Sequence, residues 1–176
     1  WIENTKGGDW GKEEPNGDFQ KAVFCLRGTD IADLKQGLPV STPLRFIKLK
    51  KFEAIEPDVG DIVIEISGGT ENQSTGRCFY INEDVCKLFS EPLIFSNFCR
   101  LLKIRDYRYS YFVYLYLNYL YDNDEFFQFE NGSSGIKNLN YKFLLQEQKY
   151  VMPSIDMVLQ FNLLVSNFFN KINKNK

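Results

Sequence analysis

The sequence between residues 60 and 69 reads Gly60-Asp61-Ile62-Val63-Ile64-Glu65-Ile66-Ser67-Gly68-Gly69. Isoleucine recurs at every second position, which is typical of a β-strand. The strand runs into a polar loop at 67–77 that is rich in glycine, serine and threonine. Glycine accepts positive φ and lets the backbone approach a partner closely. We therefore predict a strand over 61–66, a binding loop after it, and a returning strand over 77–81.

A second loop of the same character lies at 129–140. It reads Phe129-Glu130-Asn131-Gly132-Ser133-Ser134-Gly135-Ile136-Lys137-Asn138-Leu139-Asn140. Its side chains offer hydroxyl, amide and ammonium groups to a partner. Two such loops in a chain of 176 residues suggest a binding surface, because loops held by a rigid body commonly carry function.

The remaining segments complete a mixed fold. Strands are predicted at 21–26, 94–104 and 149–152, and basic and apolar side chains alternate over 45–51. Residues 1–20 are polar and acidic and predict an exposed, loosely structured entry, and a loop with Gly37, Pro39 and Pro43 is predicted after Arg27-Gly28-Thr29-Asp30. The tyrosine-rich segment 107–121 and residues 140–146 predict helices, the second capped by Asn138 or Asn140. The expected class is α+β, with a mixed, mostly antiparallel twisted sheet.

The chain ends in a predicted coiled-coil-type helix. Ser154 is a natural N-cap after Pro153, and the helix is expected to run to about Asn173. Apolar residues recur at alternating spacings of three and four, the seam of a coiled coil: Val158, Phe161, Val165, Phe168 and Ile172. We therefore divide the chain into a binding domain, 1–153, and a spacer or dimerisation helix, 154–176. The helix either finds a partner helix, as in a homodimer, or packs back on its own domain.

Composition argues against several functions. The sequence has no histidine, which removes the usual general base and the commonest metal ligand. Its four cysteines are scattered, so we expect buried thiols and no metal site. No signal peptide or membrane span is recognisable, which predicts a cytoplasmic protein without a membrane partner. Phosphate-loop and nuclease patterns are incomplete and no dinucleotide-binding fingerprint occurs, so we expect a non-catalytic chain.

The charge pattern points to DNA in spite of a net charge of −2. Basic residues cluster at 27–51 and 99–108, and a basic face would bind phosphates whatever the far side carries. Arginine and amide side chains read base edges, and hydroxyls and lysine position the backbone. The candidate DNA-binding residues are Arg27, Thr29, Ser67, Gly68, Gly69, Asn72, Gln73, Ser74, Thr75, Arg77, Asn97, Arg100, Ser133, Ser134, Lys137 and Asn138.

Two other readings stay open. A peptide or glycan module could use an aromatic groove lined by 107–121, and its binding would respond little to salt. Alternatively, the charges are simply interspersed over the surface. If the DNA reading holds, Arg77→Ala and Lys137→Ala are expected to weaken binding and to leave the melting temperature nearly unchanged.

In the order of its motifs, the chain resembles the target recognition domain of the specificity subunit of type I restriction–modification enzymes. The resemblance rests on five segments, and it covers nearly the whole chain. They are Asn4-Thr5-Lys6-Gly7-Gly8-Asp9-Trp10, Arg27-Gly28-Thr29-Asp30-Ile31, the strand and loop at 60–69, Gly132-Ser133-Ser134-Gly135-Ile136-Lys137-Asn138-Leu139, and Val151-Met152-Pro153.

This resemblance implies a non-catalytic subunit that recognises double-stranded DNA. Such subunits pair two recognition domains, each reading one half of a split sequence, and long helices set their spacing and dock two methyltransferase subunits. Adenine methylation then uses S-adenosylmethionine on the modification subunits, and cleavage uses ATP and Mg on a motor-nuclease subunit. No cofactor is expected in this chain.

The chain also departs from the family pattern. It holds one recognition domain where a full subunit has two, and its helix is short beside the family's spacer. The resemblance therefore leads us to expect a fragment, or a half-subunit that restores two-fold symmetry by dimerising. The base-contacting residues do not carry over, because that surface varies with the target.

Overall fold

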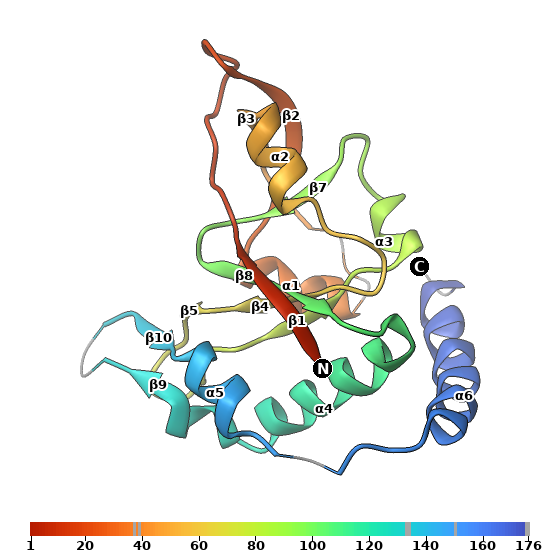
Figure 1. The fold of residues 1–176 in the computed structure, drawn as a ribbon. Coiled ribbons are helices and arrows are strands. Elements are labelled where there is room, and N and C mark those ends of the chain that lie inside the picture. Colours follow the sequence, from red (N-terminus) through yellow and green to blue (C-terminus); the bar gives the residue numbers. More distant parts are fainter. Residues whose placement is uncertain (37, 39, 133–134, 150, 175–176) are drawn as a thin grey trace.

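The computed structural model describes residues 1–36, 38, 40–132, 135–149 and 151–174, and the side chains of the last helix as far as Phe168. Within these residues the fold is α+β, and its sheets are mostly antiparallel, as the sequence predicts. Three small sheets and the helices around them build the molecule (Figure 1). The predicted strands at 61–66, 77–81 and 21–26 and the helices at 107–121, 140–146 and 154–173 are confirmed within a few residues.

The central sheet has the order β1-β8-β4-β6 and is antiparallel throughout. Its strands are β1 (Ile2–Gly7), β8 (Cys99–Ile104), β4 (Ile62–Glu65) and β6 (Cys78–Tyr80). Side chains alternate across it, so that Ile62 and Ile64 join one core and Val63 joins the other. Because both faces are covered, the isoleucine-rich strand forms the middle of the molecule.

A second sheet forms the lobe above the central sheet in Figure 1. It has the order β3-β2-β7, from β3 (Leu44–Lys48), β2 (Phe19–Leu26) and β7 (Leu93–Phe95), and β2 and β7 are parallel. Three helices accompany this half: α1 (Gly28–Gln36), α2 (Leu49–Ile55) and α3 (Glu83–Cys86). Its core includes Val23, Ile31 and Phe95, all fully buried.

Helices cover the opposite face of the central sheet. They are η1 (Tyr107–Tyr109), α4 (Ser110–Asp122), η2 (Glu125–Phe129) and α5 (Tyr141–Glu147), which lie below the sheet in Figure 1. The N-cap of α5 is Asn140, whose side chain accepts a hydrogen bond from Phe143 N at 3.2 Å. Tyr114 and Leu117 pack into this second core. The tyrosine-rich helix is thus a core helix with part of its hydroxyls at the rim.

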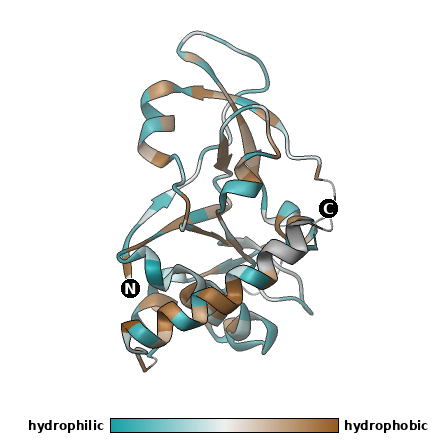
Figure 2. Ribbon diagram, turned by 90° about the vertical axis from the view of Figure 1, so that its right-hand side faces the viewer, coloured by the Kyte–Doolittle hydropathy of each residue, from teal (hydrophilic) through white to brown (hydrophobic). Residues whose placement is uncertain are grey.

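The last helix, α6 (Ile155–Lys174), packs back on its own domain over its first half. Val158 and Val165 are buried and Phe161 packs edge-on against Phe112 of α4. Farther along the seam, Phe168 is 66% exposed, and the side chain of Ile172 lies outside the described residues. Apolar residues also line the outward side of the helix (Figure 2), among them Leu163. The first three residues of the predicted seam therefore pack against their own domain and not against a second copy of the helix.

Several sequence-based expectations are wrong. Residues 1–20 are not a loose entry, because β1 pairs with β8 in the central sheet. Residues 28–36 form helix α1 where a loop was expected, since Ile31 and Leu34 lie on its buried side. The run 94–104 divides into β7 and β8, which belong to different sheets. Residues 149, 151 and 152 form no strand, and position 150 lies outside the described residues.

The cysteines provide a test of this fold. Cys25, Cys78 and Cys99 are buried and Cys86 is exposed. Burial raises the pKa of the Cys25 and Cys99 thiols to about 12, which suppresses the reactive thiolate. With a thiol-specific disulfide reagent at pH 8, we expect one fast-reacting thiol per native chain and four after denaturation. The variant Cys86→Ser should abolish the fast phase, and any fast-reacting thiol that remains in it would contradict the packing.

Candidate functional site

The two polar loops lie side by side, although about seventy residues separate them. β5 (Ser67–Gly68) pairs with β10 (Lys137–Leu139), and β10 pairs with β9 (Glu130–Asn131), giving a third small sheet of order β5-β10-β9. Leu139 N donates to Ile66 O at 3.0 Å, and Thr75 N donates to the carboxylate of Glu130 at 2.5 Å. These contacts fix the first loop against the second at one edge of the molecule.

A cleft of about 670 Å³ opens beside this small sheet. Four segments contribute to it: the chain around Trp10, the start of α1, the end of β4 with the loop after it, and the turn between β7 and β8, which lies close to β5 in Figure 1. Its lining residues are Trp10, Arg27, Gly28, Thr29, Glu65, Ser67, Gly68, Gly69, Thr70, Gln73, Arg77, Ser96, Asn97 and Phe98. This volume is in the range of sites that take small organic groups.

An ion pair between Glu65 and Arg77 forms the base of the cleft. Arg77 Nε donates to Glu65 Oε2 at 2.9 Å and Nη2 donates to Oε1 at 2.6 Å, a bidentate pair. The Glu65 side chain is 2% exposed, and this hydrogen bonding raises the pKa of Arg77. A Cβ added at Gly28 or Gly68 would lie 2.2 or 2.4 Å from Glu65 Oε1. Both glycines therefore allow the backbone to close around this carboxylate.

Arg27 is held in the same way at the mouth of the cleft. Its Nη2 donates to Asp30 Oδ1 at 2.6 Å and to Ser41 O at 3.1 Å, and its Nε donates to both Asp30 oxygens. Hydrogen bonding to the buried Asp30 raises the pKa of the Arg27 guanidinium. The guanidinium groups of two arginines that the sequence analysis assigned to DNA are thus engaged by Asp30 and Glu65. Inside the cleft their positive charges are balanced by these carboxylates.

The structure gathers half of the predicted DNA-binding residues around this cleft. Arg27, Thr29, Ser67, Gly68, Gly69, Gln73, Arg77 and Asn97 line it. Asn72 and Asn138 are exposed on the two paired loops. Ser133 and Ser134 lie outside the described residues.

Four of the other candidates have internal roles. Ser74 and Thr75 are buried, so neither is available at the surface for a phosphate. Lys137 pairs with Glu130 at 3.2 Å and stands over the Phe127 ring, with 24% of its side chain exposed. Arg100 stands over the Tyr141 ring. Its cross-strand partner is Ile64, which packs in the core on the α4 side of the central sheet, so Arg100 lies on that side as well. Arg100 is therefore not part of the cleft, because the sheet separates it from Glu65.

Sequence reasoning missed the apolar half of the cleft. Trp10 comes from the segment read as a loose entry, and Phe98 from the middle of a run read as one strand. The signal for Phe98 was the Ser-Asn pair before it, since polar residues of this kind favour a turn. The pairing of Glu65 with Arg77 had no local signal, because it spans a loop of eleven residues between them.

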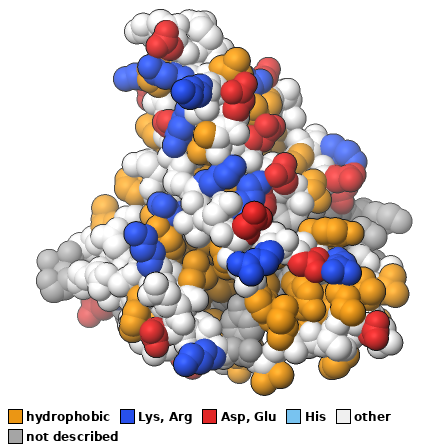
Figure 3. All heavy atoms as spheres, viewed as in Figure 1, with side chains coloured by type: hydrophobic (Ala, Val, Ile, Leu, Met, Phe, Trp, Pro, Cys, Tyr) orange, Lys and Arg blue, Asp and Glu red, His pale blue; other side chains and the backbone are white. Residues whose placement is uncertain are grey.

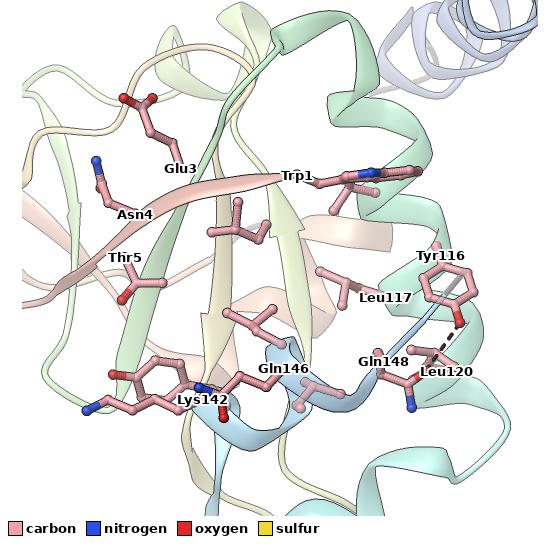
Figure 4. Close-up of a pocket in the computed structure, with 15 residues that line it drawn as sticks. Trp1, Glu3, Asn4, Thr5, Tyr116, Leu117, Leu120, Lys142, Gln146 and Gln148 are labelled. Carbon is pink, nitrogen blue, oxygen red and sulfur yellow. Dashed lines mark hydrogen bonds between the residues drawn. The ribbon is translucent and has the colours of Figure 1, made fainter. Parts of the chain in front are cut away.

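A second, smaller groove of about 410 Å³ lies on the α4 side of the molecule (Figure 4). It runs between β1, the second half of α4 and α5, with Leu117 and Leu120 at its floor and Trp1 at one end. Tyr116 donates to Gln148 Oε1 at 3.3 Å across its far side. From the tyrosine-rich segment the groove takes Val113, Tyr116, Leu117 and Leu120, so this wall is mainly aliphatic and not the aromatic one that the alternative reading expects.

The surface charge is mixed on the face seen in Figure 3. Lys and Arg side chains gather over the lobe of β2, β3 and α2 and continue along β1, with Asp and Glu side chains among them. Within the described residues, no group of three or more His, Cys, Asp or Glu side chains could hold a metal ion. In that same part of the chain, none of the helices combines the length and apolarity needed to cross a membrane.

Neither a scan against protein-family models nor a search of the curated proteins finds a match to this chain.

Proposed function

We propose that this chain recognises double-stranded DNA, as the non-catalytic specificity subunit, or half of one, of a type I restriction–modification system. Partner subunits would supply S-adenosylmethionine-dependent adenine methylation and ATP- and Mg-dependent cleavage. The observation that carries the proposal is the pairing of β5 with β10, because it joins the two polar loops at one edge. The exposed amides Asn72, Asn97 and Asn138 accompany that edge, and amides of this kind read adenine.

The proposal also agrees with how recognition domains divide their work. Base edges are read by side chains on projecting loops, while phosphates are held by lysines and hydroxyls around them. Here the loops project from a sheet whose two faces are both packed, so their positions are fixed by the core. Binding to half of a split site is weak by itself, and a second domain raises affinity through effective concentration.

Salt dependence tests the proposal. The probe is a 30-bp duplex enriched from a random pool by binding to this chain, followed by fluorescence anisotropy at increasing salt. We expect log K to fall linearly with log salt concentration. Asn138→Ala, at an exposed amide on β10, should weaken binding without changing that slope. The control is Lys87→Ala, an exposed lysine after α3 on the opposite side of the molecule in Figure 1, which should change nothing. No enrichment of any duplex, or binding indifferent to salt, would refute the proposal.

The groove of Figure 4 favours one second candidate, a peptide- or glycan-binding module. Its apolar floor and its amide rim at Gln146 and Gln148 suit an uncharged or apolar ligand. To test this candidate, the variant Trp10→Phe, in which Trp1 is the single tryptophan, is titrated with apolar peptides or oligosaccharides. Binding in the groove is followed by the change in Trp1 fluorescence. Saturable binding that is insensitive to salt would favour this module over the DNA proposal.

A further inference from the structure

The charge balance of the cleft between the start of α1, the loop after β4 and the β7–β8 turn indicates which part of a DNA molecule fits inside it. Its two arginines are each held by a buried carboxylate, Arg77 by Glu65 and Arg27 by Asp30. A phosphate entering the cleft would meet two ion pairs in place of two free cations. It would also have to be desolvated without a charge to compensate it, which is costly. The interior therefore suits a neutral group better than a backbone phosphate.

The rest of the lining has the chemistry of a site for a planar, hydrogen-bonding group. Phe98 exposes 51% of its surface at the cleft although its surroundings are polar. The hydroxyl of Thr29 and the amide of Asn97 are both exposed beside it. Aromatic faces stack with any base, and amides and hydroxyls bond to base edges. Trp10 contributes less stacking area, because Arg45 stands over its ring at 4.2 Å.

The Phe98 ring is carried on a rigid turn. Ile66 N and Ser67 N donate to Phe98 O at 2.8 and 3.3 Å, and Cys99 N donates to Ser96 O at 2.9 Å. These bonds tie the turn to the strand that leads into the first polar loop. Because the backbone is fixed on both sides, the ring stays at the rim and does not fold into the core. A ring held exposed in this way is available to stack on a partner.

We infer that this cleft receives a single nucleobase turned out of the duplex, stacked on Phe98 and bonded by Asn97 and Thr29, while the phosphates stay on the rims. The inference rests on the proposed DNA recognition and adds to it a binding mode. Turning out a base costs its pairing and stacking energy, and the cost is smallest where the base is already unpaired. Affinity should therefore rise when the partner of the extruded base is removed.

The experiment uses the full chain and the enriched 30-bp duplex. The bases of each strand are removed one at a time to give an abasic-site scan, and binding is measured by anisotropy. For the wild-type chain we expect one position at which the abasic site in the opposite strand tightens binding by about tenfold or more. Phe98→Ala should abolish that preference and weaken binding to the intact duplex about tenfold. Phe98→Leu, which keeps apolar bulk without a ring, should behave like Phe98→Ala.

Two further measurements, the salt dependence of binding and the melting temperature, distinguish base binding in the cleft from a phosphate contact or a loss of fold. For Phe98→Ala and Asn97→Ala, the slope of log K against log salt should equal that of the wild type, because no phosphate contact is lost. Their melting temperatures should also match it, since both side chains are exposed. A flat scan with a wild-type chain that still binds the duplex overturns the inference and leaves DNA recognition standing. If the wild-type chain binds no enriched duplex, both fail together.

Discussion

Arg77→Ala is expected to lower the free energy of unfolding by about 3–5 kcal/mol, because it leaves the Glu65 carboxylate buried without its partner. Glu65 is only 2% exposed and receives two hydrogen bonds from Arg77. A lone buried charge loses its hydration and gains nothing in return. Urea denaturation followed by circular dichroism measures the loss.

Two variants accompany this one. Arg77→Lys provides a single point charge without the planar fork, and we expect it to fall between the wild type and Arg77→Ala. The double variant Glu65→Leu/Arg77→Met removes both charges and should recover most of the lost stability, because buried pairs replaced by apolar groups are often neutral. A loss below about 1 kcal/mol in Arg77→Ala would show that the pair is solvated.

This expectation changes how Arg77 can be used to test DNA binding. The sequence alone predicts that Arg77→Ala weakens binding and leaves the melting temperature nearly unchanged. In the structure the same change breaks the ion pair at the floor of the cleft and destabilises the fold. A loss of DNA binding in Arg77→Ala could then result from unfolding alone. Lys137 has the same weakness, because its ammonium pairs with Glu130, whose side chain is only 6% exposed. Asn138, exposed on the same strand, is the better probe.

Gly76→Ala is expected to destabilise the chain by about 2–5 kcal/mol, through strain of the backbone and overpacking together. Gly76 has φ of +130°, a conformation that residues with a side chain rarely adopt. A Cβ there would lie 2.1 Å from the ring of Phe126, which is fully buried. The ring cannot move aside without opening the core beneath α4.

Gly17→Ala is the matched control. Its φ of +55° is also positive, but nothing lies within 4 Å of an added Cβ. It should therefore cost only the backbone strain, about 1–2 kcal/mol. Comparison of the two denaturation midpoints isolates the effect of close packing against Phe126. Equal losses in both variants would contradict the contact.

The candidate site was partly foreseeable. Glycine, serine, threonine and amide residues mark both polar loops in the sequence, and eight of the predicted residues do meet at one cleft. Its aromatic wall was not foreseeable in this way, because Trp10 lies in a segment read as a loose entry and Phe98 in a run read as one strand. The burial of Ser74 and Thr75 was also hidden, because their residue types fit a surface loop. Thr75 donates hydrogen bonds to Glu130 and to the backbone of Lys137, both from the distant second loop.

The sequence by itself determined the elements whose cause is local. Alternating isoleucines set β4, Asn140 and Ser154 set the starts of α5 and α6, and the length of the tyrosine-rich run set α4. These signals act between residues a few positions apart. Tertiary structure alone decided which segments meet: β1 with β8, β5 with β10, Glu65 with Arg77, and the seam of α6 with α4. Such pairings depend on which buried surfaces fit together across the whole chain, and no short window of sequence carries that information.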